Sequence, residues 1–233
     1  MLDEALAFPR ADDDWLETVL IGGVLSLLGF LVVPTIIVNG YLLRVMRAAV
    51  AGDATPPRFG DWADLFVDGL LLWIVQFVYM GIPAALLATV MASFAVVASV
   101  GASTGADPTG AATAAGGLVA LLVLLAVGLL FVVATYLLPA ALANFARTGE
   151  FAAAFHLRTV ARAAFSVDYL VAVLLVIVVS LVLGLVGGLL VVVLVGIFVL
   201  FYLQMVVYHL FGQGFARGLG LEGTGEPSAD PAG

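Results

Sequence analysis

Few side chains inside the long apolar stretches of this sequence are able to take part in chemistry. Asn39, Gln76 and Gln204 carry amides, and His209 carries an imidazole near the end of the last stretch. Transport pathways and proton relays usually need buried ionisable groups, and these stretches contain no Asp, Glu, Lys or Arg. Amides within a membrane commonly hydrogen-bond to neighbouring helices. We therefore interpret Asn39, Gln76 and Gln204 as intramembrane polar contacts between helices, and His209 as an imidazole at the membrane interface.

A second group of candidates is acidic. Asp61, Asp64 and Asp68 share one side of a predicted helix, where their oxygens could hold a cation. The alternative, which we favour, is a solvated face of an acidic protein. The sequence has no Ser-His-acid set, no His-Glu-x-x-His and no phosphate-binding glycine loop. It also has no cysteine, which excludes disulfides, thiolate catalysis and Cys-ligated metals. We therefore predict no enzyme activity, no metal site and no cofactor.

Aromatic and arginine side chains share one side of a third segment, which is predicted to be a helix over residues 150–165. In the headgroup layer of a membrane, phenyl rings enter the lipid while guanidinium groups reach the phosphates. The alternative is that this side packs against residues 58–68. We favour contact with lipid or a partner, made by Phe151, Phe155, Arg158 and Arg162.

The elements that position these residues are long runs without charge, over residues 19–43, 69–101, 116–146 and 169–211. About 20 apolar residues of helix cross a bilayer, and soluble domains do not contain such runs. They predict an all-α fold, a polytopic transmembrane helical bundle of about five spans with short cytoplasmic interfacial helices. We expect one transmembrane domain over residues 1–217 and a disordered polar tail over 218–233. The predicted spans cover about residues 18–43, 69–101, 118–143, 168–187 and 189–212.

Local signals refine two of these spans. Asp14 and Glu17 have the spacing of a capping box, so the first long helix should begin there. The second span would be about 50 Å long as a helix, more than a simple crossing needs. Gly81 and Pro83 lie near its middle, so it is either one kinked and tilted crossing or a re-entrant pair of half-helices.

The charge composition indicates the habitat and excludes one class of partner. All eight basic residues are Arg, and the sixteen acidic residues give a formal net charge of -8. An acidic, lysine-free surface suits a salt-saturated cytoplasm, so we interpret the chain as haloarchaeal; a GC-rich genome is the alternative. Nucleic-acid binding needs clustered cations, so no nucleic-acid partner is expected.

The distribution of arginine predicts the orientation. Arginines occur in the connections 44–68 and 144–167, whereas the loop 101–117 has none. The positive-inside rule then places both connections in the cytoplasm of a multi-pass cell-membrane protein. With five spans, the N-terminus is predicted outside and the C-terminus in the cytoplasm. No cleavable signal peptide is expected, because Asp3 and Glu4 stand where a basic region should be.

The two halves of the sequence also show a weak internal repeat. Each half contains a span with a proline, a Gly-acid pair after it, and a second span that opens with Val-Asp-x-Leu. Chance and an internal two-fold repeat remain equal alternatives, and a duplication would be of the parallel kind. The matching positions are Pro34 and Pro139, Gly52-Asp53 and Gly149-Glu150, and Val67-Asp68 and Val167-Asp168.

Several of these segments together resemble a known family. They are Asp12-Asp13-Asp14-Trp15, Ile21-Gly22-Gly23, Gly40 to Val45, Pro57 to Leu70, Tyr136 to Pro139, Ala153-Ala154-Phe155, Asp168-Tyr169-Leu170 and Phe201 to Gln204. The sequence resembles the archaeal family catalogued as domain of unknown function 4013, over roughly residues 5–216. The resemblance implies an integral membrane protein without an established activity and without catalytic residues to transfer.

Two functions follow from these observations as expectations. The first is a non-enzymatic membrane protein that organises lipid or binds a partner, because catalytic groups are missing and the connections carry arginine. The second is a small-solute transporter or channel component, motivated by the repeat and the kinked spans. The expected partners are membrane lipids and either another protein or a second copy of the chain.

Overall fold

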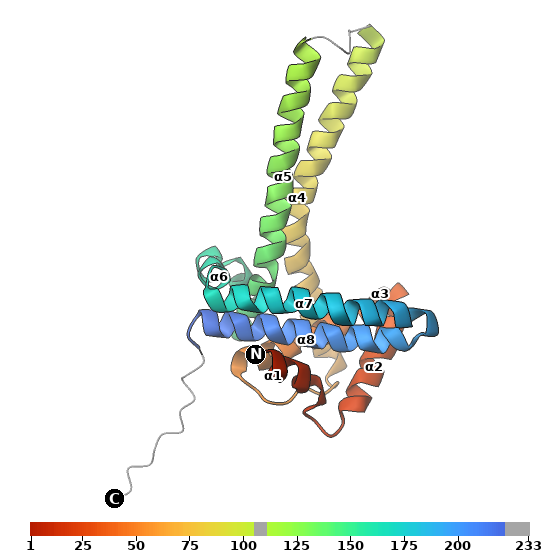
Figure 1. Cartoon of the computed structure of the whole chain (residues 1–233), viewed down its shortest axis with the longest axis vertical. Coiled ribbons are helices and arrows are strands. Elements are labelled where there is room, and N and C mark those ends of the chain that lie inside the picture. Colours follow the sequence, from red (N-terminus) through yellow and green to blue (C-terminus); the bar gives the residue numbers. More distant parts are fainter. Residues whose placement is uncertain (105–110, 222–233) are drawn as a thin grey trace, which may run out of the picture. The chain divides into compact units, whose positions relative to one another are not determined.

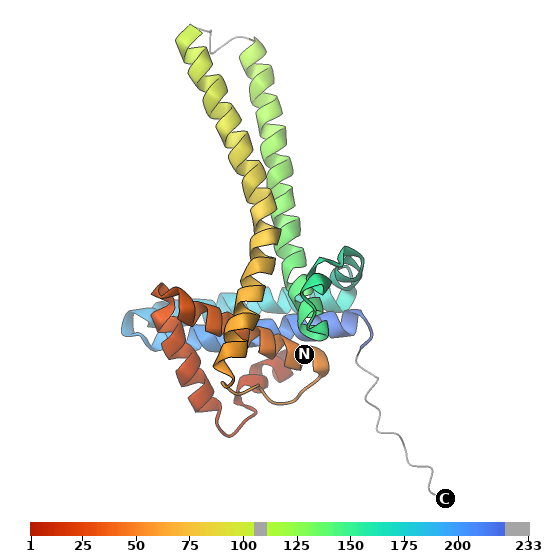
Figure 2. The same cartoon turned by 180° about the vertical axis from the view of Figure 1, so that it is seen from behind.

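The computed structural model describes residues 1–104 and 111–221, which form helices joined by short connections (Figures 1 and 2). Five of the helices are long and apolar enough to cross a membrane, so the prediction of an all-α, multi-pass fold is confirmed. The α-helices are α1 (Leu2–Ala7), α2 (Trp15–Leu27), α3 (Val32–Ala51), α4 (Trp62–Thr104), α5 (Ala111–Thr148), α6 (Leu157–Ala164), α7 (Val167–Leu190) and α8 (Val195–Gly218). Four 3₁₀ helices accompany them: η1 (Phe8–Arg10), η2 (Leu28–Phe30), η3 (Phe151–Phe155) and η4 (Val191–Val193).

The chain divides into two compact units. Unit one comprises Met1–Val75 and Pro139–Gly233, and unit two comprises Gln76–Leu138. The single transmembrane domain over 1–217 therefore stays a prediction. Most of the predicted tail, from residue 222 on, and the centre of the loop 101–117 lie outside the described residues.

The first predicted span, residues 18–43, is not one helix. α2 ends at Leu27, η2 follows, and α3 begins only after Leu31, whose backbone is extended. Pro34 is the third residue of α3, where its missing N–H costs no helical hydrogen bond. The proline that seemed to lie within a crossing therefore marks the start of a second helix.

α2 and α3 form a helical hairpin along α8. On α2, Gly23 lies against the ring of Phe198 near the start of α8. On α3, Ala49 lies against Gly212 near the other end of α8. The chain thus meets the early turns of α8 through α2 and its later turns through the end of α3.

α7 and α8 form a second hairpin and run side by side in both views (Figures 1 and 2). The turn lies at η4 and at Leu194, which has a positive φ of 62°, rather than near residue 188, where the predicted spans 168–187 and 189–212 meet. Gly187 instead lies within α7, where a Cβ would come 2.8 Å from Leu200 of α8. Small residues of this kind let membrane helices approach closely.

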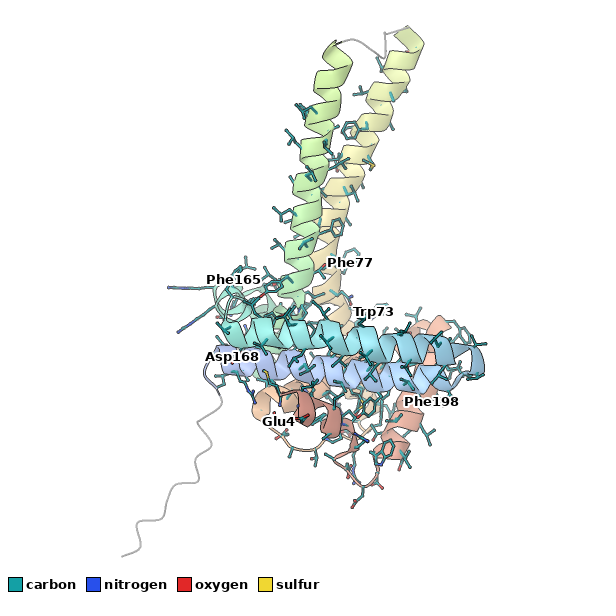
Figure 3. The ribbon with its side chains drawn as sticks, viewed as in Figure 1. Glu4, Trp73, Phe77, Phe165, Asp168 and Phe198 are labelled. Atoms are coloured by element: carbon teal, nitrogen blue, oxygen red, sulfur yellow. The ribbon has the colours of Figure 1, made fainter. Side chains whose placement is uncertain are left out.

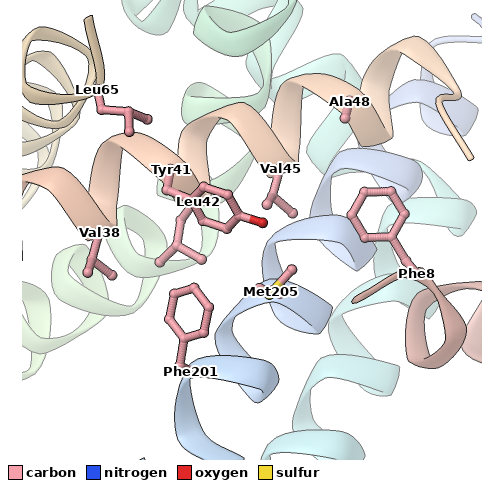
Figure 4. Packing of buried hydrophobic residues seen from close by; sticks show 9 residues of the cluster. All are labelled: Phe8, Val38, Tyr41, Leu42, Val45, Ala48, Leu65, Phe201 and Met205. Atoms are coloured by element: carbon pink, nitrogen blue, oxygen red, sulfur yellow. The ribbon is translucent and has the colours of Figure 1, made fainter. Parts of the chain in front are cut away.

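The core of unit one lies between α3, α8 and η1. Tyr41 and Leu42 of α3 face Phe201 and Met205 of α8 (Figure 4). The ring of Tyr41 also stacks on the ring of Phe59, with centroids 4.0 Å apart. The two ring faces that meet in this contact are removed from solvent. The other members of this cluster are Phe8, Val38, Val45, Ala48 and Leu65.

α3 crosses the first turns of α4 at two glycines. A Cβ on Gly40 would overlap the carbonyl oxygen of Leu65, and a Cβ on Gly69 would overlap that of Ile36. The two backbones therefore touch directly, with no side chain between them. The contact between the two backbones sets the positions of the neighbouring residues. These residues carry most of the charges of α3 and α4.

Unit two contains the C-terminal part of α4, from Gln76 on, and the N-terminal part of α5, as far as Leu138. α4 is continuous through Gly81 and Pro83, so the re-entrant alternative for the second span is wrong. The side chains of this unit are mainly apolar and exposed, as at Phe77, which is 77% exposed (Figure 3). Two such helices without a core of their own need lipid or other apolar partners around them.

Candidate functional site

The charged site of this protein begins where α3 meets α4. Asp68 of α4 pairs with two guanidinium groups of α3, Arg44 at 3.6 Å and Arg47 at 3.4 Å. Arg44 also donates to the backbone oxygen of Gly60 at 3.1 Å, and Arg47 donates to that of Ala146 at 3.2 Å. Asp68 is therefore held in an ion-pair network and is not available as part of a cation site.

The two other acidic residues of that helix face do not complete a metal site. Asp61 and Asp64 are exposed, and no group of three His, Cys, Asp or Glu residues suited to a metal ion occurs within 1–104 and 111–221. The three carboxylates of the possible cation site therefore have different surroundings. One carboxylate pairs with arginine, and two face solvent.

The acidic segment before α2 binds the connection between α3 and α4. Arg58 donates two hydrogen bonds to Asp12, at 3.0 and 3.1 Å, and also pairs with Asp14 at 2.9 Å. The hydrogen bonds from Arg58 lower the pKa of the Asp12 carboxyl below its usual value, and they raise the pKa of Arg58. This arrangement is a bidentate guanidinium–carboxylate pair.

Asp14 stands at the N-cap of α2, as predicted, but its side chain makes no capping hydrogen bond. The capping box expected from Asp14 and Glu17 is therefore not formed. The Asp14 carboxylate is drawn instead to Arg58, a charged partner that the local sequence pattern does not reveal.

Glu4 of α1 joins the N-terminal segment to the end of α8 (Figure 3). Its carboxylate accepts a hydrogen bond from Gln213 at 3.0 Å and pairs with Arg217 at 3.4 Å. The N-terminal ammonium lies 3.0 Å away, and its hydrogen bond is the main cause of the lowered pKa of Glu4. The Tyr202 hydroxyl also donates to the carbonyl oxygen of Leu6, so α1 lies on α8.

These contacts join residues that the predicted topology places on opposite sides of the membrane. The N-terminus was expected outside, with Arg58 and Arg217 in the cytoplasm, yet Glu4 touches Arg217 and Asp12 touches Arg58. Contacts of this length cannot join opposite sides of a membrane. Residues 18–43, on whose single crossing that topology depends, are broken at η2 and Leu31, and the orientation of the chain stays a prediction.

One pattern unites the charged residues that the structure describes. They lie in the connections or terminal turns at the open ends of three helical hairpins, α2–α3, α4–α5 and α7–α8. The closed ends at residues 28–31 and 191–194 are entirely apolar. Ser166 beside Gly218 and Arg47 beside Ala146 bring the open ends together in unit one.

The segment 150–165 is not one helix. η3 and α6 meet at His156, and the aromatic and arginine residues separate there. Phe151 packs edge-on against Phe145 and Phe155, with centroids 6.3 and 5.3 Å apart, so these rings contact the protein itself. Arg158 and Arg162 are exposed on α6, and they have no ion-pair partner among the described residues.

The buried side of α6 explains its position. Val160, Ala163 and Ala164 are fully buried, and α6 packs on α7 and α8. Its other side presents Leu157, 62% exposed, and is followed by Phe165, 75% exposed. Arginine next to exposed apolar side chains is the pattern of an interfacial helix.

Two of the three predicted intramembrane amides meet in one cavity of unit one. Asn39 and Gln204 line a space of about 350 Å³, together with Ser26, Thr35 and Tyr208. Asn39 donates to the backbone oxygen of Thr35 in its own helix at 2.8 Å, so the predicted tie between helices is not formed by its amide nitrogen. Gln76 is exposed at the start of unit two and does not line this cavity.

Sequence reasoning missed the polar residues at the end of α8. His209, Gln213 and Arg217 are spaced four residues apart and thus lie along one side of the helix. This spacing was visible in the sequence, but only His209 was considered. Glu4, which completes the group, is 209 residues away from Gln213 and has no local signal.

The apolar hairpins and their charged ends define the class of this protein as a multi-pass helical membrane protein. A family model described as Protein of unknown function (DUF4013) matches residues 25–192, and the chain belongs to that family. This agrees with the resemblance seen in the sequence. No curated protein and no solved structure matches the chain significantly.

Proposed function

We propose that this protein is a non-enzymatic membrane component that organises anionic lipid, or a partner, at one membrane surface. The observation that carries the proposal is the exposed side of α6. There, Arg158 and Arg162 have no ion-pair partner among the described residues and stand beside exposed Leu157 and Phe165. The guanidinium groups would meet lipid phosphates, and the apolar side chains would enter the acyl boundary.

The same proposal includes an orientation. All eight basic residues are arginines at the open ends of the hairpins, so the positive-inside rule favours a cytoplasmic position for these ends and for both terminal helices. The lysine-free, acidic composition supports a halophilic archaeal source. The charged surface would then face a cytoplasm rich in salt, and the hairpins would enter the membrane from that side.

Lipid retention tests the function. Each arginine near an anionic surface contributes about 1 kcal/mol, so the double change Arg158→Gln and Arg162→Gln should weaken association with anionic lipid roughly 30-fold. The measurement is the amount of anionic lipid that co-purifies with the protein, determined by mass spectrometry.

A matched control separates charge from structure. The double change Arg158→Lys and Arg162→Lys keeps both charges and should retain most of the lipid. Circular dichroism checks that both variants remain helical. Equal lipid retention by the glutamine variant and the parent would show that α6 is not a lipid-binding surface.

The cavity at Asn39 and Gln204 favours a second candidate function, a small-solute transporter or channel component. The side-chain amide of Gln204 makes no hydrogen bond within the described part of the chain and faces a space with four other polar residues. Such a space suits a small polar solute. Transport predicts that Asn39→Leu and Gln204→Leu abolish solute uptake into vesicles while leaving lipid retention unchanged, and the lipid-organising function predicts no uptake by the parent protein.

A further inference from the structure

A second and larger cavity lies at the open ends of the hairpins in unit one. Its volume is about 520 Å³. Three parts of the chain form its walls: the N-terminal segment, the end of α3 with its turn, and the last turns of α8. The lining residues that bear on its chemistry are Glu4, Phe8, Asp53, His209, Gln213 and Arg217.

The α8 wall presents polar groups at two depths. His209 is only 3% exposed, and its ring stacks on Phe8 with centroids 4.0 Å apart. Gln213 is 9% exposed and lies between His209 and the ion pair of Arg217 with Glu4. The spacing of four residues places the three side chains along one stripe of the helix.

Two buried atoms of this wall have no partner. Nδ1 of His209 and Oε1 of Gln213 make no hydrogen bond to any described residue. The hydrogen bond to Glu4 fixes the orientation of the Gln213 amide. A carboxylate can only accept, so the group that lies 3.0 Å from it must be the donor Nε2. Oε1 is therefore an unused acceptor, and buried polar atoms without a partner are uncommon in folded proteins.

The free groups determine which ligand the cavity suits. Gln213 offers an acceptor, and Asp53 adds a carboxylate that makes no hydrogen bond or ion pair through its side chain within the described residues. Arg217 is already paired with Glu4. The cavity thus offers acceptors and negative charge, and a complementary ligand must bring N–H donors and positive charge.

The remaining lining favours an organic ligand over a metal ion. Phe8 and several alanines give the cavity an apolar wall. The described residues contain no group of three His, Cys, Asp or Glu suited to a metal. The volume is also far larger than one ion needs.

We propose that this cavity is a binding site for a small organic cation with N–H donors, such as a primary amine. In this proposal the ammonium group donates to Oε1 of Gln213 and to the carboxylate of Asp53, which both line the cavity, and the carbon chain contacts Phe8. This site is separate from α6 and does not depend on the proposed lipid contact.

Calorimetric titration of the purified full-length protein in detergent tests the site with n-butylammonium and tetramethylammonium as probes. We expect saturable binding of n-butylammonium and at least tenfold weaker binding of tetramethylammonium, which has the charge but no N–H donor. Gln213→Leu removes the buried acceptor and should weaken n-butylammonium binding at least tenfold. Gln76→Leu is the matched control, because Gln76 is an exposed glutamine that lines neither cavity, and it should bind like the parent.

A second variant guards against loss of folding in the first. Asp53 is exposed at the end of the α3 turn, so Asp53→Asn leaves the core intact and should still weaken n-butylammonium several-fold. The proposal is overturned if n-butylammonium does not bind saturably, which would mean that the cavity holds only water. Equal affinities of the Gln213→Leu and Gln76→Leu variants would overturn it as well.

Discussion

At the scale of single residues, Gly40 and Gly69 decide how α3 and α4 meet. An alanine methyl at position 40 would overlap the carbonyl oxygen of Leu65, a backbone atom that cannot rotate away. Gly40→Ala should therefore push the helices apart and weaken the pairing of Arg44 with Asp68 on the same junction. We expect a loss of roughly 3 kcal/mol, measured by thermal unfolding in detergent.

The control for this substitution lies at a glycine without close neighbours. A Cβ on Gly128 of α5 would meet nothing within 4 Å. Gly128→Ala should be neutral or stabilising by up to about 1 kcal/mol, because alanine favours helix more than glycine does. Equal effects at positions 40 and 128 would mean that α3 and α4 do not touch as described.

Asp12 gives a prediction about pH. Its folded-state pKa is lowered by Arg58, so the pair stabilises the protein above the ordinary pKa of about 3.9 and is lost as pH falls through the lower folded value. Arg58→Gln should raise the pKa of Asp12 toward about 3.9, as measured by NMR titration of its carboxyl. Arg10→Gln changes a nearby exposed arginine that makes no ion pair in the described structure, and it should leave the Asp12 pKa unchanged.

The residues of the candidate sites show what sequence reasoning reaches and what it does not. The exposed arginines of α6 were predictable, because a local pattern of Arg and apolar side chains carries the signal. The pairing of Asp12 with Arg58 spans 46 positions, and that of Glu4 with Gln213 spans 209. No periodicity encodes such distances, which depend on how the helices return along one another.

At the scale of elements, the start of α7 differs from that of the other helices whose N-caps are described, α1–α3, α6 and α8. Among these N-cap residues, only that of α7 makes a capping hydrogen bond through its side chain. The Ser166 hydroxyl accepts from the backbone N–H of Tyr169 at 3.2 Å and donates to the carbonyl oxygen of Ala163 at 2.7 Å. It thereby joins the end of α6 to the start of α7. Ser166→Ala should cost about 1 kcal/mol of unfolding free energy, whereas Ser166→Asp should retain most of the cap.

Chemical unfolding followed by circular dichroism measures this effect. Ser99→Ala in α4 is the control, because its hydroxyl donates only to the carbonyl oxygen of Val96 in the same helix and should matter little. If Ser166→Ala and Ser166→Asp unfold alike, the hydroxyl does not cap α7.

The long helices were predictable because a bilayer sets their length and excludes charge. Both requirements apply to consecutive residues and can therefore be recognised in the sequence. The breaks between these helices were harder to predict from the sequence. Residues 28–31 and 191–194 are as apolar as the helices they separate, so composition does not mark them. Pro34 lies at a helix start, but proline is also tolerated inside membrane helices. The sequence alone therefore does not decide between a helix start and a continuous helix at this position.

At the scale of the whole molecule, the charged residues that the structure describes lie in the connections and terminal turns of three hairpins. Contacts within unit one join two pairs of these residues, Glu4 with Arg217 and Asp12 with Arg58. A repeat of two halves also stays a prediction. Its two Gly-acid turns share one local feature, because Gly52 and Gly149 both end a helix with a positive φ, of 82° and 72°.

Labelling of single cysteines in this cysteine-free chain tests the topology. The informative substitutions are Asp13→Cys, Thr55→Cys and Ser103→Cys, which all replace exposed residues. Under the proposed orientation, an impermeant thiol reagent added to intact cells should label position 103 alone, and positions 13 and 55 should react only after the cells are opened. Position 13 is decisive, because one crossing over residues 18–43 would place it outside. Labelling at 13 without labelling at 55 would separate Asp12 from Arg58 and contradict the hairpin, whereas labelling at 13 and 55 but not at 103 would keep the hairpin and reverse its orientation.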